Sequence, residues 1–72
     1  MKKIGNYNVG DKLVVKGINK DSLVKRKLMD MGITPGVSIE ITGKAPLGDP
    51  IEVYVRGYKL TLRKEEADAI LI

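Results

Sequence analysis

The chain has 72 residues and a formal net charge of +4, with 43% hydrophobic and 31% charged residues. This balance is typical of a folded domain and too apolar for a disordered chain, and the length predicts one domain over residues 1–72. The sequence contains no cysteine and no histidine, which excludes a disulfide scaffold, a thiolate zinc site and catalysis by a Cys or His side chain.

No segment of the sequence predicts membrane insertion or export. The apolar runs, such as 13–15 and 70–72, are a few residues long, whereas a membrane-spanning helix needs roughly 20. The basic start at residues 1–3 is followed by Gly5 and polar residues instead of the apolar stretch of a secretory signal. We therefore expect a cytoplasmic protein.

The first predicted strand covers residues 12–16. Leu13 and Val15 alternate with Val14 and would face one side, and Gly17 is expected to end the strand.

A helix is predicted over residues 22–31, with Asp21 or Ser22 capping its first turn. Gly32 is placed to adopt a left-handed conformation after the last turn, which brings Leu28 and Ile33 together in a Schellman ending. Pro35 then prevents continuation. The apolar stripe of this helix consists of Val24, Leu28 and Met31, and Leu23 is expected to lie at its edge.

The second half of the chain predicts further strands by alternation of apolar and polar residues. A Pro-Gly turn at Thr34–Val37 precedes them, and a helical turn at 64–69 leads to a last strand at 70–72. The alternating strands cover residues 37–42, 51–55 and 58–62, and a Gly/Pro-rich loop covers 43–50.

Two registers are open for the hairpin between the last two of these strands. If Arg56-Gly57 is a two-residue loop, Tyr54 lies opposite Lys59. A slip that makes Gly57-Tyr58 the loop keeps the same faces inward. The expected fold is mainly β: a small, bent barrel of about five strands, with an α-helix between strands 1 and 2 and a short helical turn before the last strand.

Several segments resemble the ferrous-iron-transport protein A (FeoA) family. The signature segment is Leu28-Met29-Asp30-Met31-Gly32-Ile33-Thr34-Pro35-Gly36, and the resemblance continues at residues 46–51, 56–63, 66–67 and 70. It implies an SH3-like barrel and a cytoplasmic accessory role beside FeoB, a membrane protein that imports ferrous iron and carries a GTP-binding domain. The same fold occurs as an interaction module of metal-responsive repressors, so such a module is an alternative.

The residues themselves predict neither an enzyme nor a specific metal or cofactor site. The carboxylate pair Glu65-Glu66 has no partner base and is expected to be a solvated, charged turn. The sequence also contains no phosphate-loop pattern for binding a nucleotide. Ferrous iron is usually held by imidazole, carboxylate or thiolate. The isolated carboxylates show no helical pairing: Asp11, Asp21, Asp30, Glu40, Asp49, Glu52 and Asp68.

Nucleic-acid binding is an alternative, because small basic barrels often bind RNA. Residues 9–17 resemble the Gly-started strand of KOW-type ribosomal domains. Aromatic residues make up only 4% of the chain, so stacking platforms are scarce. Only Tyr54 is expected to face outward beside a lysine.

Docking to a partner protein fits the sequence best. Residues 1–29 carry eight basic against two acidic residues, a charge that could meet an acidic protein surface. Leu47 either projects from its loop as an apolar contact or folds back as a lid over the barrel. The outer helix face, with Lys27, would steer the protein toward an acidic surface, expected on FeoB. The candidate partner-binding residues are Lys25, Arg26, Lys44, Pro46, Leu47, Tyr54 and Lys59.

Overall fold

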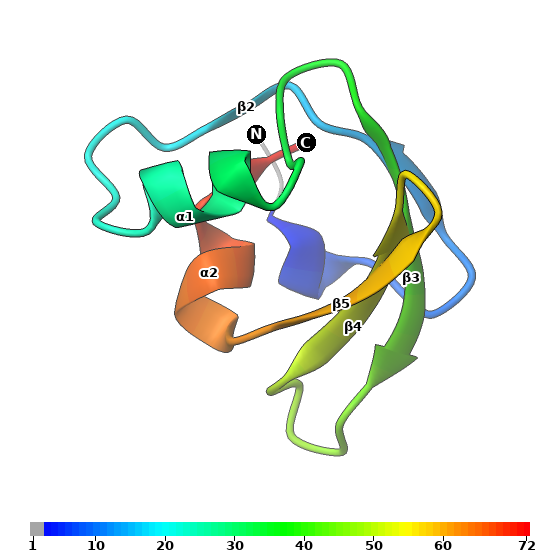
Figure 1. Cartoon of the computed structure of the whole chain (residues 1–72). Helices are drawn as coiled ribbons and strands as arrows, with labels where there is room; N and C mark the ends of the chain where they lie inside the picture. Colours follow the sequence, from blue (N-terminus) through cyan, green and yellow to red (C-terminus); the bar gives the residue numbers. More distant parts are fainter. Residues whose placement is uncertain (1–2) are drawn as a thin grey trace.

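The computed structural model describes residues 3–72 and contains two antiparallel sheets, two short α-helices and a 3-10 turn (Figure 1). This mainly β arrangement confirms the predicted fold class. The elements are η1 (Ile4–Asn6), β1 (Lys12–Val14), β2 (Gly17–Ile18), α1 (Lys25–Asp30), β3 (Ser38–Lys44), β4 (Ile51–Val55), β5 (Tyr58–Leu62), α2 (Lys64–Asp68) and β6 (Ile70–Leu71).

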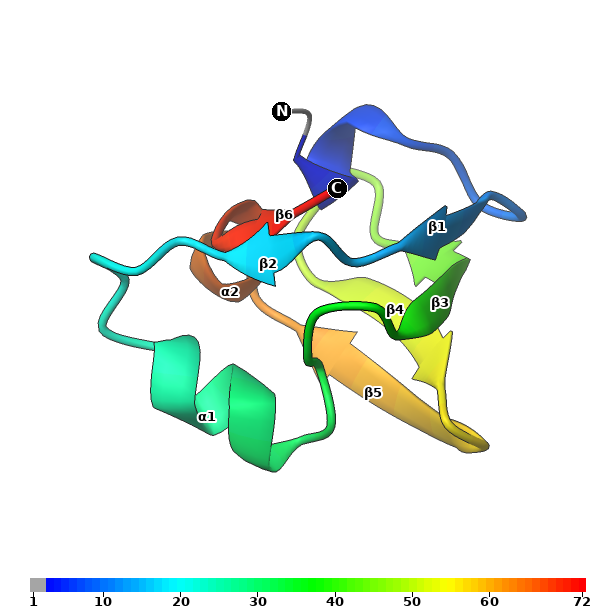
Figure 2. The ribbon, with the colours of Figure 1, turned by 90° about the horizontal axis from the view of Figure 1, so that it is seen from above.

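The predicted first strand is divided between the two sheets. The larger sheet has the order β1-β3-β4-β5, and the smaller one pairs β2 with β6. Gly17, which was expected to end the strand, instead begins β2 and lies opposite Leu71, while Ile18 lies opposite Ile70. Figure 2 shows β1 beside β3 and β2 beside β6, so the chain passes from one sheet to the other between Val14 and Gly17.

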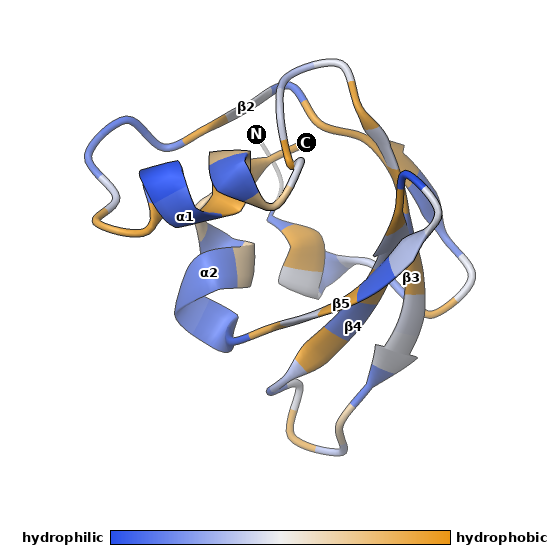
Figure 3. Ribbon diagram, viewed as in Figure 1, coloured by the Kyte–Doolittle hydropathy of each residue, from blue (hydrophilic) through white to orange (hydrophobic). Residues whose placement is uncertain are grey.

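The alternation of apolar and polar residues along the strands decides which side chains enter the core (Figure 3). The inward positions of the first predicted strand, Leu13 and Val15, are buried, whereas Val14 is exposed, which confirms the predicted facing. The core consists of Ile4, Leu13, Val15, Ile18, Leu28, Ile33, Ile39, Ile41, Ile51, Val53, Val55, Leu62, Ala67, Ala69 and Ile70.

The hairpin between β4 and β5 has the two-residue loop Arg56-Gly57. Both loop residues have positive φ angles, 52° and 87°, which is the conformation of a type I′ turn. Tyr54 consequently lies opposite Lys59. The slipped register with Gly57-Tyr58 as the loop is therefore wrong.

Helix α1 is shorter than predicted at its start and ends as predicted. The Oγ of Ser22 accepts a hydrogen bond from the backbone N–H of Val24 at 3.2 Å, so residues 22–24 form a turn ahead of the helix. At the other end Gly32 has a φ of +94°, and the N–H of Ile33 donates to the carbonyl of Leu28 at 3.0 Å. This bond confirms the Schellman ending.

The amino-terminal turn η1 is not indicated by any pattern in the sequence. Its Ile4 is fully buried, and η1 packs against α2. The Nζ of Lys44 donates to the carbonyl oxygens of Gly5 and Tyr7, each at 3.0 Å. Because these bonds cap two free carbonyls, they fasten the start of the described chain to the end of β3.

Candidate partner-binding surfaces

The loop after β3 projects Leu47 into solvent. This side chain is 96% exposed, so the expectation that it projects is confirmed and the lid alternative is wrong. The loop is closed by the bond from the N–H of Gly48 to the carbonyl of Ala45 at 2.7 Å. Pro46 is also exposed, while the amino group of Lys44 points toward η1. A depression of about 250 Å³ separates Leu47 from η1.

A second apolar surface lies along α1. Leu23 is fully exposed and Met29 is 42% exposed, and both line a surface depression of about 600 Å³ together with Lys25 and Arg26. Ser22 and Asp30 complete its wall. We call this depression, with its six lining residues, the α1 groove. Figure 3 shows the apolar segment immediately before the helix.

The exposure of Leu23 corrects its predicted place beside the buried stripe of the helix. Because the helix begins only at Lys25, Leu23 belongs to the preceding turn and points away from the core. Met29 was not predicted as a contact residue, although its position off the Val24–Leu28–Met31 stripe would have signalled an exposed apolar side chain.

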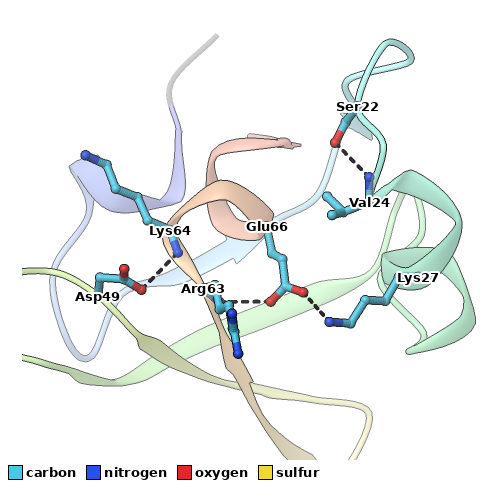
Figure 4. Close-up of polar contacts among 7 residues, drawn as sticks. All are labelled: Ser22, Val24, Lys27, Asp49, Arg63, Lys64 and Glu66. Carbon is cyan, nitrogen blue, oxygen red and sulfur yellow. Dashed lines mark hydrogen bonds and ion pairs between the residues drawn. The ribbon is translucent and has the colours of Figure 1, made fainter.

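Lys27 and Glu66 form an ion pair, which corrects two predictions (Figure 4). Glu66 was expected in a solvated turn but is only 3% exposed, and Lys27 was expected to steer a partner from the outer helix face. The Nζ of Lys27 lies 2.5 Å from Oε2 of Glu66, and the N–H of Arg63 donates to Oε1 at 2.9 Å. Figure 4 also shows the N–H of Lys64 donating to Asp49.

These contacts lower the pKa of the Glu66 carboxyl. The hydrogen bond from Lys27 is the largest cause, and the backbone N–H of Arg63 is the next; together they exceed the opposing effect of burial. Glu66 is therefore a charged anchor between α1 and α2. Of the basic helix residues, Lys25 and Arg26 line the α1 groove.

Tyr54 and Lys59 lie side by side on the outer face of the larger sheet, as expected for the Arg56-Gly57 loop, which is one of the two registers that the sequence left open. Tyr54 also lies opposite Glu40, which in turn lies opposite Lys12. The predicted contact residues thus occupy three places: the outer sheet face, the Leu47 loop and α1. Figures 1 and 2 both show the loop over residues 45–50 and α1 on different sides of the molecule.

Among residues 3–72, no three Asp or Glu side chains are grouped so that they could hold a metal ion. Neither helix in this range has the length and apolar character needed to cross a membrane.

The chain is similar to proteins of iron transport. Residues 2–72 match the FeoA domain family. An NMR structure of a FeoA-like protein from Clostridium acetobutylicum is 50% identical, with a TM-score of 0.87 over 99% of this chain and 86% of that chain. A zinc complex of Stenotrophomonas maltophilia FeoA, described as a procaryotic SH3 domain protein, has a TM-score of 0.85 at 21% identity over 99% of this chain and 88% of that chain.

A curated relative joins two proteins in one chain. It is the Fe(2+) transport protein A/Fe(2+) transporter FeoB fusion protein of Porphyromonas gingivalis, which is 26% identical over 68 residues. The match covers 94% of this chain but spans only 8% of the fusion protein. Together with the family match over residues 2–72, the described fold shows that this chain belongs to the FeoA family, which is involved in ferrous iron transport, and that its fold is SH3-like.

Proposed function

We propose that this protein is a non-catalytic accessory protein of bacterial ferrous iron uptake, which acts by contact with the cytoplasmic part of a FeoB-type transporter. The observation that carries the proposal is the fusion protein, in which a FeoA-like segment and FeoB share one chain. Fusion holds two partners at high effective concentration, which favours their contact. In this account the protein resides in the cytoplasm and reaches the inner face of the membrane through its partner.

The α1 groove is the surface best suited to this contact. Interfaces combine an apolar anchor with a polar rim, and here Leu23 and Met29 supply the exposed apolar area while Lys25 and Arg26 supply positive charge. Basic side chains at a rim accelerate association with an acidic surface. Leu47 provides a second, separate apolar contact on another side of the molecule.

Association kinetics with the purified cytoplasmic part of FeoB test this assignment. The double variant Lys25→Glu/Arg26→Glu should slow association about tenfold at low salt and weaken its salt dependence. Leu23→Asp should raise the dissociation rate, because it places a charge where the apolar anchor docks. The matched control is Lys12→Glu/Lys16→Glu, which changes the net charge equally at exposed positions away from α1 and should bind normally.

The possible negative results distinguish a wrong docking surface from a wrong function. If binding is unchanged by both α1 variants and weakened by Leu47→Asp, the loop and not the α1 groove is the docking site. If FeoB is not retained with or without guanine nucleotide, the proposed function is wrong. Recovery of RNA or of a metal-responsive repressor in the same pull-down would favour the alternative functions.

A further inference from the structure

A run of basic residues extends from the loop before β5, along β5, to the start of α2. Residues 56–64 contain Arg56, Lys59, Arg63 and Lys64 and no acidic residue. This segment therefore has a local formal charge of +4, while residues 1–29, with eight basic and two acidic residues, are also basic. Among residues 3–72, none of its four basic side chains forms an ion pair.

One edge of β5 is free to accept another strand. β5 ends the order β1-β3-β4-β5, and within residues 3–72 it pairs with β4 alone. In an antiparallel ladder closed by a two-residue loop, the closing pair Val55–Tyr58 exchanges hydrogen bonds, so Lys59 and Thr61 direct their backbone groups away from β4. Within the described residues, these two peptide groups make no hydrogen bond outside the ladder.

We infer that this free edge of β5 binds an extended acidic peptide segment, which adds to the sheet as a further strand. The backbone groups of Lys59 and Thr61 supply the main-chain hydrogen bonds of such an addition. Arg56, Lys59 and Arg63 supply the charge complement of acidic side chains on the incoming strand. This site is distinct from the α1 groove and goes beyond the proposed contact with FeoB.

A depression at the carboxyl end of β5 continues the edge. It has a volume of about 400 Å³, and its lining includes Thr61 and Arg63 together with Lys27, Pro50, Asp49 and Glu66. Of the two acidic groups in this wall, Glu66 is neutralised by Lys27, and Asp49 accepts the backbone N–H of Lys64. The depression therefore offers room for a side chain of the added strand beside the guanidinium of Arg63.

The charge of β5 and the placement of the exposed tyrosines disfavour two other ligands at this edge. A second copy of the chain would place one positively charged β5 against another, which costs free energy by like-charge repulsion. A single-stranded nucleic acid would use aromatic side chains as stacking platforms. Tyr54 and Tyr58 are exposed, but their register positions lie on opposite faces of the hairpin, so they do not form one platform.

The test uses the full chain, labelled with nitrogen-15, and the blocked hexapeptide acetyl-Glu-Val-Glu-Val-Glu-Val-amide. We expect the largest amide shifts at Lys59 and Thr61 and slower hydrogen exchange at both. Thr61→Pro removes one edge donor without removing a bond to β4, and it should weaken binding about tenfold. Thr61→Val keeps the donor and should bind normally. Lys59→Glu/Arg63→Glu should weaken binding by at least about tenfold.

Altered peptides test the same inference without depending on whether the Thr61→Pro protein folds. A peptide N-methylated at every residue, which has no N–H left to donate to β5 along either edge, should lose binding. The unmethylated peptide with Lys in place of Glu should not bind. Lys25→Glu/Arg26→Glu should bind the peptide normally, even if its contact with FeoB is lost. The inference is overturned by shifts elsewhere, by equal binding of the N-methylated peptide, by self-association through β5, or by tighter binding of oligouridylate to the same residues.

Discussion

The amino group of Lys27 on α1 lies against the carboxylate of Glu66 on α2, and this pair joins two helices that are 39 residues apart in sequence. Glu66 also accepts the N–H of Arg63, the residue before α2. One carboxylate therefore caps its own helix and fastens the other helix to it. Since Leu23 and Met29 are carried by α1 and the turn before it, the pair also holds the α1 groove in place.

Replacing Lys27 by Met should lower the free energy of unfolding by about 1–2 kcal/mol, because Glu66 is left as a buried charge with only one hydrogen bond. The value lies at the low end for a buried pair, since the Lys27 side chain is 60% exposed and its charge is screened by water. Urea unfolding measures the difference. Lys25→Met on the same helix is the matched control and should change it by less than about 0.5 kcal/mol.

Glu66 should also make the stability depend on pH in the acid range. Its pKa is lower in the folded protein than the usual value of 4.5. Its contribution to stability is therefore complete above the unfolded pKa and is lost as the pH falls through the folded pKa. We expect Glu66→Gln to be less stable than the unaltered protein at pH 7 and to approach it below pH 4.5. A difference between the two that stays constant from pH 7 to pH 2.5 would contradict this account.

Local sequence patterns predicted those parts of the fold that depend on near neighbours. The Schellman ending needs only Gly32 and the residues beside it, and the hairpin needs only Arg56-Gly57 between two alternating runs. The pairing of Gly17 with Leu71 could not be predicted in this way. A two-residue strand carries no periodicity, and its partner lies at the other end of the chain.

The candidate site was predictable to a similar extent. Lys25 and Arg26 fall off the apolar stripe of the helix and do line a surface groove. The role of Lys27 was wrong because nothing local distinguishes it from its two basic neighbours, and only the position of α2 turns it toward Glu66. Lys44 was predicted as a contact residue, but its amino group is bound to η1, an element without a sequence pattern.

The end of α1 should be sensitive to substitution of Gly32. A Cβ at this position would meet Cδ of Arg56 at 3.5 Å, an ordinary contact, so the cost of Gly32→Ala comes from the φ of +94°. We expect the free energy of unfolding to fall by about 1–2 kcal/mol. Gly5→Ala is the control: its Cβ would meet nothing within 4 Å and no positive φ is involved. Equal effects of the two substitutions would show that backbone strain is not the cause.

The amino-terminal turn should contribute to the stability of the whole domain through Ile4. This side chain is fully buried against the core, and loss of a single buried methylene, as in Ile4→Val, typically costs about 0.5–1.5 kcal/mol. Val9→Ala, at an exposed position in the following turn, should cost less than about 0.5 kcal/mol. Both are measured by urea unfolding at pH 7. If Ile4→Val leaves the free energy of unfolding unchanged, residues 4–6 open separately from the sheets, and the bonds from Lys44 to Gly5 and Tyr7 then hold only a peripheral segment.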